Sequence, residues 1–249
     1  MSALDAALAT PGLGWLILAA CAAGIVRGFT GFGTALMFMP VAGALVSPFW
    51  ALVILVVMDS IGPLPTVPRA FRDGAPREVA RLMGGVILGL PMGLWLLDRV
   101  PVAAFQWAVS GVALVLLAVL MSGWRYRGPR GAVVSGVTGW VSGFLGGSTG
   151  LGGPPVVLYY MASGLPARVL RGNFQLFFVG TNASFIVVLA AMGYLSATAL
   201  VLGLMMVPPF LLANLLGAAM FRPERERLYR LSAYGLIALA ALAGLPIWR

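Results

Sequence analysis

The sequence GFTGFG at residues 28–33 recurs as GSTGLG at residues 147–152, with its glycines at the same spacing. Each copy lies between two short apolar runs, and three longer apolar runs complete each half of the chain. The other glycines that this repeat aligns are Gly24 with Gly143, Gly93 with Gly217 and Gly111 with Gly235. Two copies of one unit explain the pattern most simply, with repeat 1 over about residues 12–122 and repeat 2 over about residues 131–247.

The composition places both copies in a lipid bilayer, as a single transmembrane domain over residues 1–249. Of the 249 residues, 61% are hydrophobic and only 9% are charged, whereas a soluble domain carries about 25% charged residues. The apolar runs that we expect to be helical are residues 12–27, 32–46, 49–68, 79–97 and 102–122 in repeat 1, and residues 131–146, 152–163, 167–193, 197–220 and 227–247 in repeat 2.

The lengths of these runs predict how each repeat crosses the bilayer. About 20 helical residues span the hydrocarbon core, so the last three runs of each repeat are expected to span it. The first two runs are shorter and meet at the Gly-rich motif, as two half-helices or as one tilted span and one broken helix. The predicted fold is an all-α integral membrane protein, in which each repeat is a Gly-rich broken helical pair followed by three transmembrane helices, with about eight to ten helical segments in total.

The distribution of arginine predicts the orientation of the chain. All 16 basic residues are Arg, and most of them lie in short loops between apolar runs. This distribution is typical of the positive-inside rule, so the net charge of +9 does not indicate a nucleic-acid-binding face. The Arg-rich loops, which this rule places in the cytoplasm, are residues 69–81, 123–130, 164–171 and 221–230. The loops 98–101 and 194–197 and both termini, with Arg249, then face the periplasm. Because the equivalent loops 69–81 and 194–197 fall on opposite sides, we predict inverted repeats, which are typical of secondary transporters.

The residues that are missing exclude several kinds of site. The chain has no His and one cysteine, Cys21, so we expect no disulfide, no metal site built on His or Cys, and no cofactor. The apolar runs hold no pair of carboxylates for acid–base chemistry, so we expect no enzymatic activity. The start of the chain lacks a basic region and carries Asp5, which is not the pattern of a cleaved signal peptide.

The Gly-rich motifs are candidate binding elements. Non-helical backbone at membrane depth is tolerated where it lines a cavity, and each motif precedes a helix that Thr34, or Pro154 and Pro155, can begin. A helix N-terminus attracts anions, although glycines in membrane helices also serve as close-packing faces. The candidate substrate-binding residues of the two motifs are Gly28, Thr30, Gly31, Gly33, Thr34, Ser148, Thr149, Gly150, Gly152 and Gly153.

Charged residues at membrane depth are functional candidates because they are costly there. Arg27 directly precedes the first motif, where it can attract an anion or extend toward the membrane interface. Asp59 is the only carboxylate inside an apolar run. It can carry a coupling proton, since burial favours the neutral form, or it can pair with Arg27 and neutralise it.

Polar residues in the run 167–193 extend the candidate site. Arg171, Asn173 and Gln175 are proposed as further substrate-binding residues, whereas Arg168 is expected to anchor the helix at the cytoplasmic face. Other polar side chains can line a hydrophilic path or form hydrogen bonds between helices, namely Thr181, Asn182 and Asn214. The prolines at 63, 65 and 68 are expected to mark a helix exit or kink.

The motifs resemble those of a known transporter family. The sequences GFTGFGTALMFMP at residues 28–40 and SGFLGGSTGLGGPPVVLYYM at residues 142–161 are similar to those of the TauE/SafE sulfite exporter (TSUP) family. The first copy departs from the Gly-Gly-Gly run common in that family, having Gly33-Thr34-Ala35, while the second has Gly152-Gly153-Pro154. The resemblance covers nearly the whole chain and implies a multi-pass protein of the bacterial inner membrane.

The resemblance also implies a function. The expected activity is secondary transport, as an exporter, of small sulfur-containing anions such as sulfite, sulfonates or related organosulfur compounds, with proton coupling as one option. An anion channel of the same architecture and a carrier of another small organic anion are the alternatives. The expected partners are the anionic substrate and the lipid bilayer, with a homodimer left open and no nucleic acid.

Overall fold

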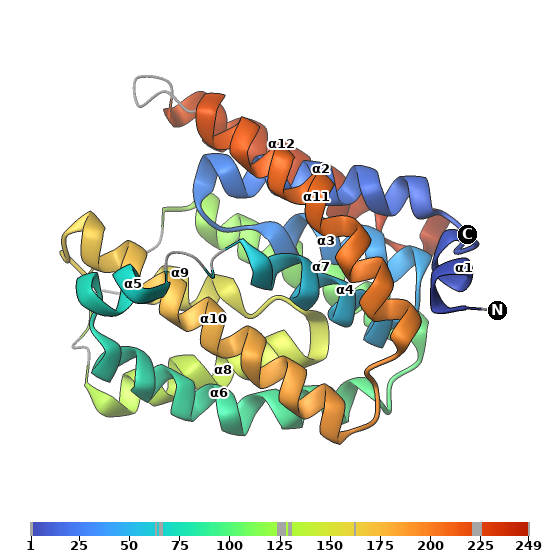
Figure 1. Cartoon of the computed structure of the whole chain (residues 1–249). Coiled ribbons are helices and arrows are strands. Elements are labelled where there is room, and N and C mark those ends of the chain that lie inside the picture. Colours follow the sequence, from blue (N-terminus) through green and yellow to red (C-terminus); the bar gives the residue numbers. More distant parts are fainter. Residues whose placement is uncertain are drawn as a thin grey trace.

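The computed structural model describes residues 2–62, 64, 67–123, 128, 131–161, 163–220 and 226–248. Over these residues the chain is helical and contains no β-strand, so the all-α prediction is confirmed (Figure 1). The helices are α1 (Ala3–Leu8), α2 (Leu13–Thr30), α3 (Thr34–Leu45), α4 (Pro48–Ile61), α5 (Val67–Asp73), α6 (Pro76–Leu97), α7 (Val102–Met121), α8 (Ala132–Thr149), α9 (Gly153–Met161), α10 (Ala167–Ala191), α11 (Ala197–Met220), α12 (Glu226–Ala243) and a terminal 3-10 turn (Pro246–Trp248).

Among the described residues, four helices are long and apolar enough to cross a membrane, namely α6, α7, α10 and α11. Each of the ten predicted apolar runs contains a helix. The predicted number of eight to ten helical segments did not include the short helices α1 and α5. The prediction that residues 49–68 form one spanning helix is wrong, because α4 ends at Ile61 after 14 residues. Of the prolines expected to mark a helix exit or kink, Pro68 lies in α5, while Pro63 and Pro65 lie outside the described residues.

The apolar part of α12 is also shorter than the run predicted at 227–247. It covers Leu231–Ala243, because the helix begins among charged residues at Glu226 and the chain turns after Ala243. The multi-pass architecture therefore combines four long helices with several shorter apolar ones.

The first two helices of each repeat form antiparallel hairpins, and these turn at the Gly-rich motifs. In repeat 1, the start of α2 lies beside the end of α3. A methyl group placed on Gly12, just before α2, would lie only 2.9 Å from the side chain of Leu45. In repeat 2, the hydroxyl groups of Ser135, early in α8, and Tyr159, late in α9, lie 3.0 Å apart. Since α2 and α8 have 18 residues each, about 27 Å of helix, each hairpin pairs one nearly spanning helix with one short helix.

Each repeat packs its first helix against a long helix of the other repeat. A methyl group on Gly28 of α2 would lie 2.5 Å from the Asn214 carbonyl oxygen of α11, and one on Gly147 of α8 would lie 2.5 Å from the Leu90 carbonyl oxygen of α6. Backbones this close require small residues. The two contacts use equivalent positions in the two repeats and tie the halves together; the inversion of the repeats stays a prediction from the arginine distribution.

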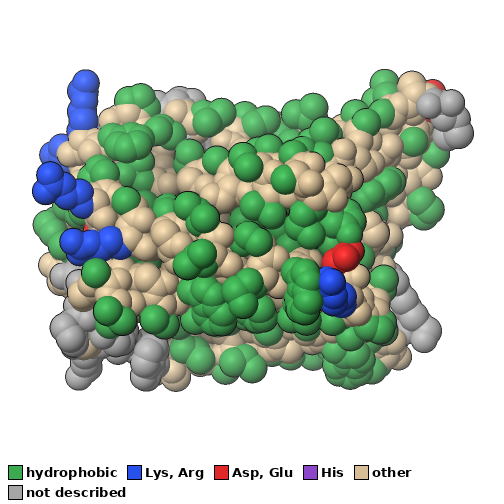
Figure 2. Space-filling model, turned by 90° about the horizontal axis from the view of Figure 1, so that it is seen from below, with side chains coloured by type: hydrophobic (Ala, Val, Ile, Leu, Met, Phe, Trp, Pro, Cys, Tyr) green, Lys and Arg blue, Asp and Glu red, His purple; other side chains and the backbone are tan. Residues whose placement is uncertain are grey.

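The surface of the molecule agrees with a membrane environment. Both marked chain ends lie at one end of the molecule, and α5 and the starts of α6 and α10 lie at the other (Figure 1). Figure 2 shows hydrophobic side chains over the middle of one lateral face, with basic side chains concentrated at one end. The arginines at 125, 127 and 130 in loop 123–130, those at 222 and 225 in loop 221–230, and the predicted periplasmic Arg249 lie outside what the structure describes, whereas Arg227 and Arg230 belong to the start of α12.

Candidate functional site

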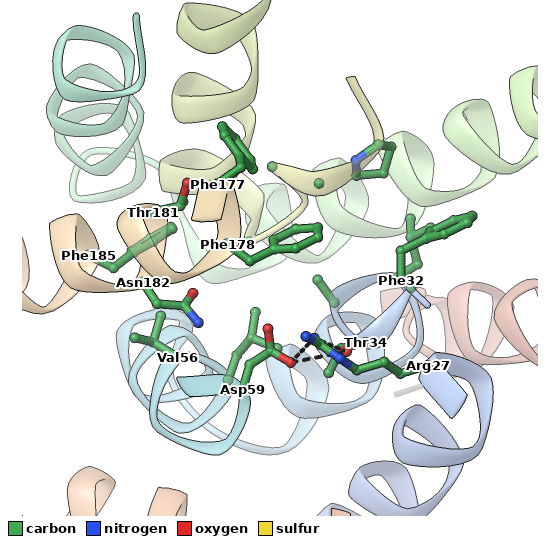
Figure 3. Close-up of a pocket in the computed structure, with 18 residues that line it drawn as sticks. Arg27, Phe32, Thr34, Val56, Asp59, Phe177, Phe178, Thr181, Asn182 and Phe185 are labelled. Carbon is green, nitrogen blue, oxygen red and sulfur yellow. Dashed lines mark hydrogen bonds and ion pairs between the residues drawn. The ribbon is translucent and has the colours of Figure 1, made fainter. Parts of the chain in front are cut away.

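A cavity of about 60 Å³ lies where the two hairpin turns meet α4 and α10 (Figure 3). A water molecule needs about 10–15 Å³ of such volume, so the cavity has room for roughly four to six water-sized atoms. It is lined by Arg27, Phe32, Gly33, Thr34, Ala35, Leu36, Leu55, Val56, Asp59, Gly150, Gly152, Gly153, Pro154, Phe177, Phe178, Thr181, Asn182 and Phe185. The cavity is therefore small, mostly apolar, and built by both repeats.

One wall of the cavity carries an ion pair. Arg27, in the last turn of α2, donates through Nη1 to Asp59 Oδ1, in the last turn of α4, and to the Thr34 hydroxyl group at 3.1 Å. The Thr34 hydroxyl group also lies 3.3 Å from Asp59 Oδ1. The Arg27 and Asp59 side chains are only 15% and 10% exposed. Of the two roles considered for Asp59, pairing with Arg27 is the arrangement observed.

The guanidinium group of Arg27 keeps donors for a further ligand. Its hydrogen bonds to described residues all come from Nη1, whereas a guanidinium group carries N–H donors on Nε and Nη2 as well. Its carbon lies 5.8 Å from the centre of the Phe178 ring, a cation–π distance. A planar cation against an apolar ring is suited to an oxyanion, because Arg binds such groups through paired hydrogen bonds.

The opposite wall is formed by α10. Phe177, Thr181 and Phe185 recur at the spacing of one helical face, and Phe178 and Asn182 lie beside them. Among the described residues, the buried Asn182 Nδ2 has no hydrogen-bond partner, and Figure 3 shows this side chain extending toward Asp59. A buried amide donor without a partner is costly, so Asn182 offers a hydrogen bond to a ligand in the cavity.

Two helix N-termini also open at the cavity, and they are unequal. The first hydrogen bond of α3 runs from Met37 N to Gly33 O at 3.1 Å, so the N–H groups of the residues between them have no partner within the helix. Gly33 permits this start by adopting φ of +94°. At the start of α9, Pro154 and its neighbour Pro155 lack N–H groups. Repeat 1 therefore contributes more donors to an anion than repeat 2.

Part of the predicted site is assembled in this cavity. The predicted residues that line it are Arg27, Gly33, Thr34, Asp59, Gly150, Gly152 and Gly153. The predicted residues that do not line it are Gly28, Thr30, Gly31, Ser148, Thr149, Arg171, Asn173 and Gln175. The second group divides into residues that shape the motifs and residues near the start of α10.

Thr30 and Thr149 shape the two turns in the same way. The Thr30 hydroxyl group donates to Val26 O at 2.9 Å and accepts from Phe32 N at 3.2 Å. The Thr149 hydroxyl group donates to Leu145 O at 2.7 Å and accepts from Leu151 N at 3.3 Å. Gly31 and Gly150 follow them with φ of +76° and +79°, values that favour glycine. These threonines hold the turns that position the cavity.

Gly28 and Ser148 likewise serve the helices of the motifs. Gly28 lies against the backbone of α11, so its role is close packing, the alternative considered for these glycines. The Ser148 hydroxyl group donates to Phe144 O at 2.8 Å, within its own helix.

The start of α10 forms a separate connection to α5 and α6. Asn173 is buried, and its Oδ1 accepts from Ala75 N at 2.6 Å. Arg168 pairs with Asp73, and the hydrogen bond from Arg168 lowers the pKa of the Asp73 carboxyl group. Arg171 is exposed and Gln175 is half-buried. Asn173 and Arg168 therefore join α10 to the α5–α6 segment at the arginine-rich end of the molecule, before the part of α10 that lines the cavity.

The sequence reasoning missed the aromatic walls. Phe32, Phe177, Phe178 and Phe185 line the cavity, and phenylalanine in a membrane helix does not by itself distinguish a cavity from a lipid-facing surface. The available signal was the helical spacing of Phe177 and Phe185 around Thr181. Thr181 and Asn182 line this mostly apolar cavity, whereas Asn214 lies at the contact between α2 and α11.

Comparison with known proteins connects this architecture to a family. The model of the family described as sulfite exporter TauE/SafE matches residues 16–244, which include both hairpin turns and every residue of the cavity. No match was found among curated proteins or among solved structures. The helical multi-pass fold and the duplicated Gly-rich turns agree with the family match. The chain therefore belongs to the sulfite exporter TauE/SafE family of membrane transporters.

Proposed function

We propose that this protein is a secondary carrier that exports a small oxidised-sulfur anion, such as sulfite or a sulfonate, across the bacterial inner membrane. The observation that carries the proposal is the Arg27 guanidinium group, which lies in a small apolar cavity between the two hairpin turns. Family membership supports the choice of sulfur anions. The periplasmic location of both termini belongs to the same proposal and follows from the positive-inside rule.

The chemistry of the cavity supports an anion of this kind. The Arg27 guanidinium group, the first N–H groups of α3 and the Asn182 amide are all hydrogen-bond donors suited to oxyanion oxygens. The aromatic walls give the cavity an apolar surrounding, in which each of these interactions is stronger than in water. A sulfite ion has four heavy atoms, which fits a volume for roughly four to six water-sized atoms.

The arrangement of the repeats supports a carrier in preference to a channel. The first helix of each repeat packs tightly against a long helix of the other repeat, α2 with α11 and α8 with α6, and both hairpin turns line the cavity. In an inverted pair of repeats these units can exchange roles and open the cavity to either side. Coupling to protons is part of the proposal, because Asp59 is the carboxylate within hydrogen-bond reach of Arg27 and Thr34.

Flux through the purified protein in liposomes tests this function. Sulfite and methanesulfonate are to be loaded inside, and their release measured with and without an imposed pH gradient. The expected result is saturable flux of at least one of the two anions that responds to the gradient. An absence of flux for both anions would overturn the substrate class, flux that ignores the gradient would overturn proton coupling, and flux that never saturates would favour a channel.

A further inference from the structure

The cavity already contains an anion, the Asp59 carboxylate. It accepts from Arg27 Nη1 and lies within hydrogen-bond distance of the Thr34 hydroxyl group, donors that a substrate oxyanion can also use. Asp59 belongs to the last turn of α4, which ends two residues later at Ile61. The carboxylate therefore lies at the end of an element and occupies donors of the cavity wall.

The charge around Asp59 is balanced by a single residue. The helices packed most extensively against α4 are α3, α10 and α11. The first and last of these contain no ionisable side chain, and the only ionisable side chains of α10 are Arg168 and Arg171 near its start. Arg27 from α2 is therefore the ionisable side chain that faces Asp59 among the described residues, and the net charge of the pair is zero.

We infer that Asp59 is a tethered competitor for the substrate, displaced from Arg27 and Thr34 when the anion binds and protonated as it leaves. Each monovalent anion is then carried together with one proton. This inference rests on the proposed function, and it adds the exchange mechanism and its stoichiometry. The substrate oxygen replaces the Asp59 oxygen as the acceptor of the Arg27 Nη1 hydrogen bond.

Charge balance explains why a proton accompanies the anion. An anion bound beside the charged Asp59 would leave a net negative charge within apolar walls, which is strongly disfavoured. Two anionic groups that share one cation also repel each other, so protonation of one of them is favoured. Adding one proton to the Asp59 carboxylate restores the net charge of zero that the empty cavity has.

The structure provides a place for the displaced carboxyl group. Figure 3 shows Asn182 on the side of Asp59 that faces away from Arg27. Its Nδ2 has no hydrogen-bond partner among the described residues, and a neutral carboxyl group can both donate to an amide and accept from it. Asn182 therefore offers hydrogen bonds to Asp59 once the anion has taken its place.

The test measures proton uptake when an anion binds to the purified protein in detergent. Methanesulfonate is the probe, because it stays fully ionised at neutral pH and any proton taken up must go to the protein. Isothermal titration calorimetry in Bis-Tris and in Tris, which have different ionisation enthalpies and carry no sulfonate group, gives the number of protons bound. The wild type is expected to take up about one proton per anion, with the affinity falling about tenfold for each unit of pH increase.

The Asp59→Asn variant lacks the competitor. It is expected to bind methanesulfonate at pH 8 about tenfold or more tightly than the wild type, without proton uptake. The Asp73→Asn variant is the matched control, because Asp73 also pairs with an arginine but lies outside the cavity. It is expected to bind with the affinity and proton uptake of the wild type.

Several outcomes would overturn the inference. Wild-type binding without proton uptake would do so while leaving anion binding, and hence the proposed function, intact. Asp59→Asn binding with wild-type affinity and proton uptake would assign the proton to another group. If Asp59→Asn does not fold, the wild-type proton count decides alone. Wild-type protein that binds no methanesulfonate and no sulfite would overturn the proposed function as well.

Discussion

The buried pair of Arg27 and Asp59 makes a quantitative prediction about stability. In the Arg27→Met variant Asp59 loses its cation, and in the Asp59→Asn variant Arg27 loses its anion. Both side chains are at least 85% buried, and removing one partner of a buried ion pair costs about 3–5 kcal/mol. The double variant removes both charges and leaves neither uncompensated. Its loss of stability should be smaller than the sum of the two single losses, by about 2 kcal/mol or more.

The assay is reversible unfolding in mixed detergent micelles, followed by circular dichroism of the helical signal. The wild type, both single variants and the double variant are compared under the same conditions. The same cycle on Asp73 and Arg168, whose arginine side chain is 71% exposed, should give a much smaller coupling. Single losses that add up to the double loss within about 0.5 kcal/mol would refute the claim that the cavity holds a coupled buried pair.

Three further predictions concern the fold. Gly147→Ala should destabilise the protein by about 1–3 kcal/mol in the same unfolding assay, since its methyl group would lie 2.5 Å from Leu90 O. Gly136→Ala, on the same helix, is the control. Its methyl group would meet open space, so the substitution should be neutral or stabilising by up to about 1 kcal/mol. Because its pKa is lowered in the folded protein, the ionised Asp73 stabilises the α5–α10 contact at neutral pH and loses this effect as the pH falls through its folded pKa. The hydrogen exchange rate of α5 should therefore rise in acid in the wild type. In Asp73→Asn, which lacks the carboxylate, acid should not raise this rate. Single cysteines at positions 75 and 196, in a Cys21→Ala background, should be labelled from opposite sides of the membrane, and labelling from one side would contradict inverted repeats.

The hairpins and the ion pair could be predicted because each has a distinct sequence signal. The duplicated glycines mark positions where the backbone takes positive φ, as Gly31 and Gly150 do. Arg27 and Asp59 are isolated charges in apolar runs, and such charges find each other because burial without a partner is costly.

Other features depend on how helices rotate and pack, which the sequence pattern does not reveal. Asn173 is polar and lies in an apolar run, yet its side chain serves the connection to Ala75 instead of the cavity. Its orientation is decided by the close approach of α5 and α10 at Gly74 and Gly172. The end of α4 at Ile61 is a different case, because the prolines at 63, 65 and 68 indicate a helix exit or kink, while the run 49–68 places the end of the helix too late.

The central claim is that Arg27 holds the transported anion, and counterflow in liposomes tests it most directly. Vesicles loaded with unlabelled sulfite are diluted into a trace of radiolabelled sulfite, so that exchange on a carrier accumulates label inside. The wild type should accumulate label, and Arg27→Ala should not. Arg99→Ala is the control, because it removes an arginine that is stacked on Trp95 outside the cavity. This variant should accumulate label as the wild type does. Counterflow by Arg27→Ala at the wild-type rate would contradict the account.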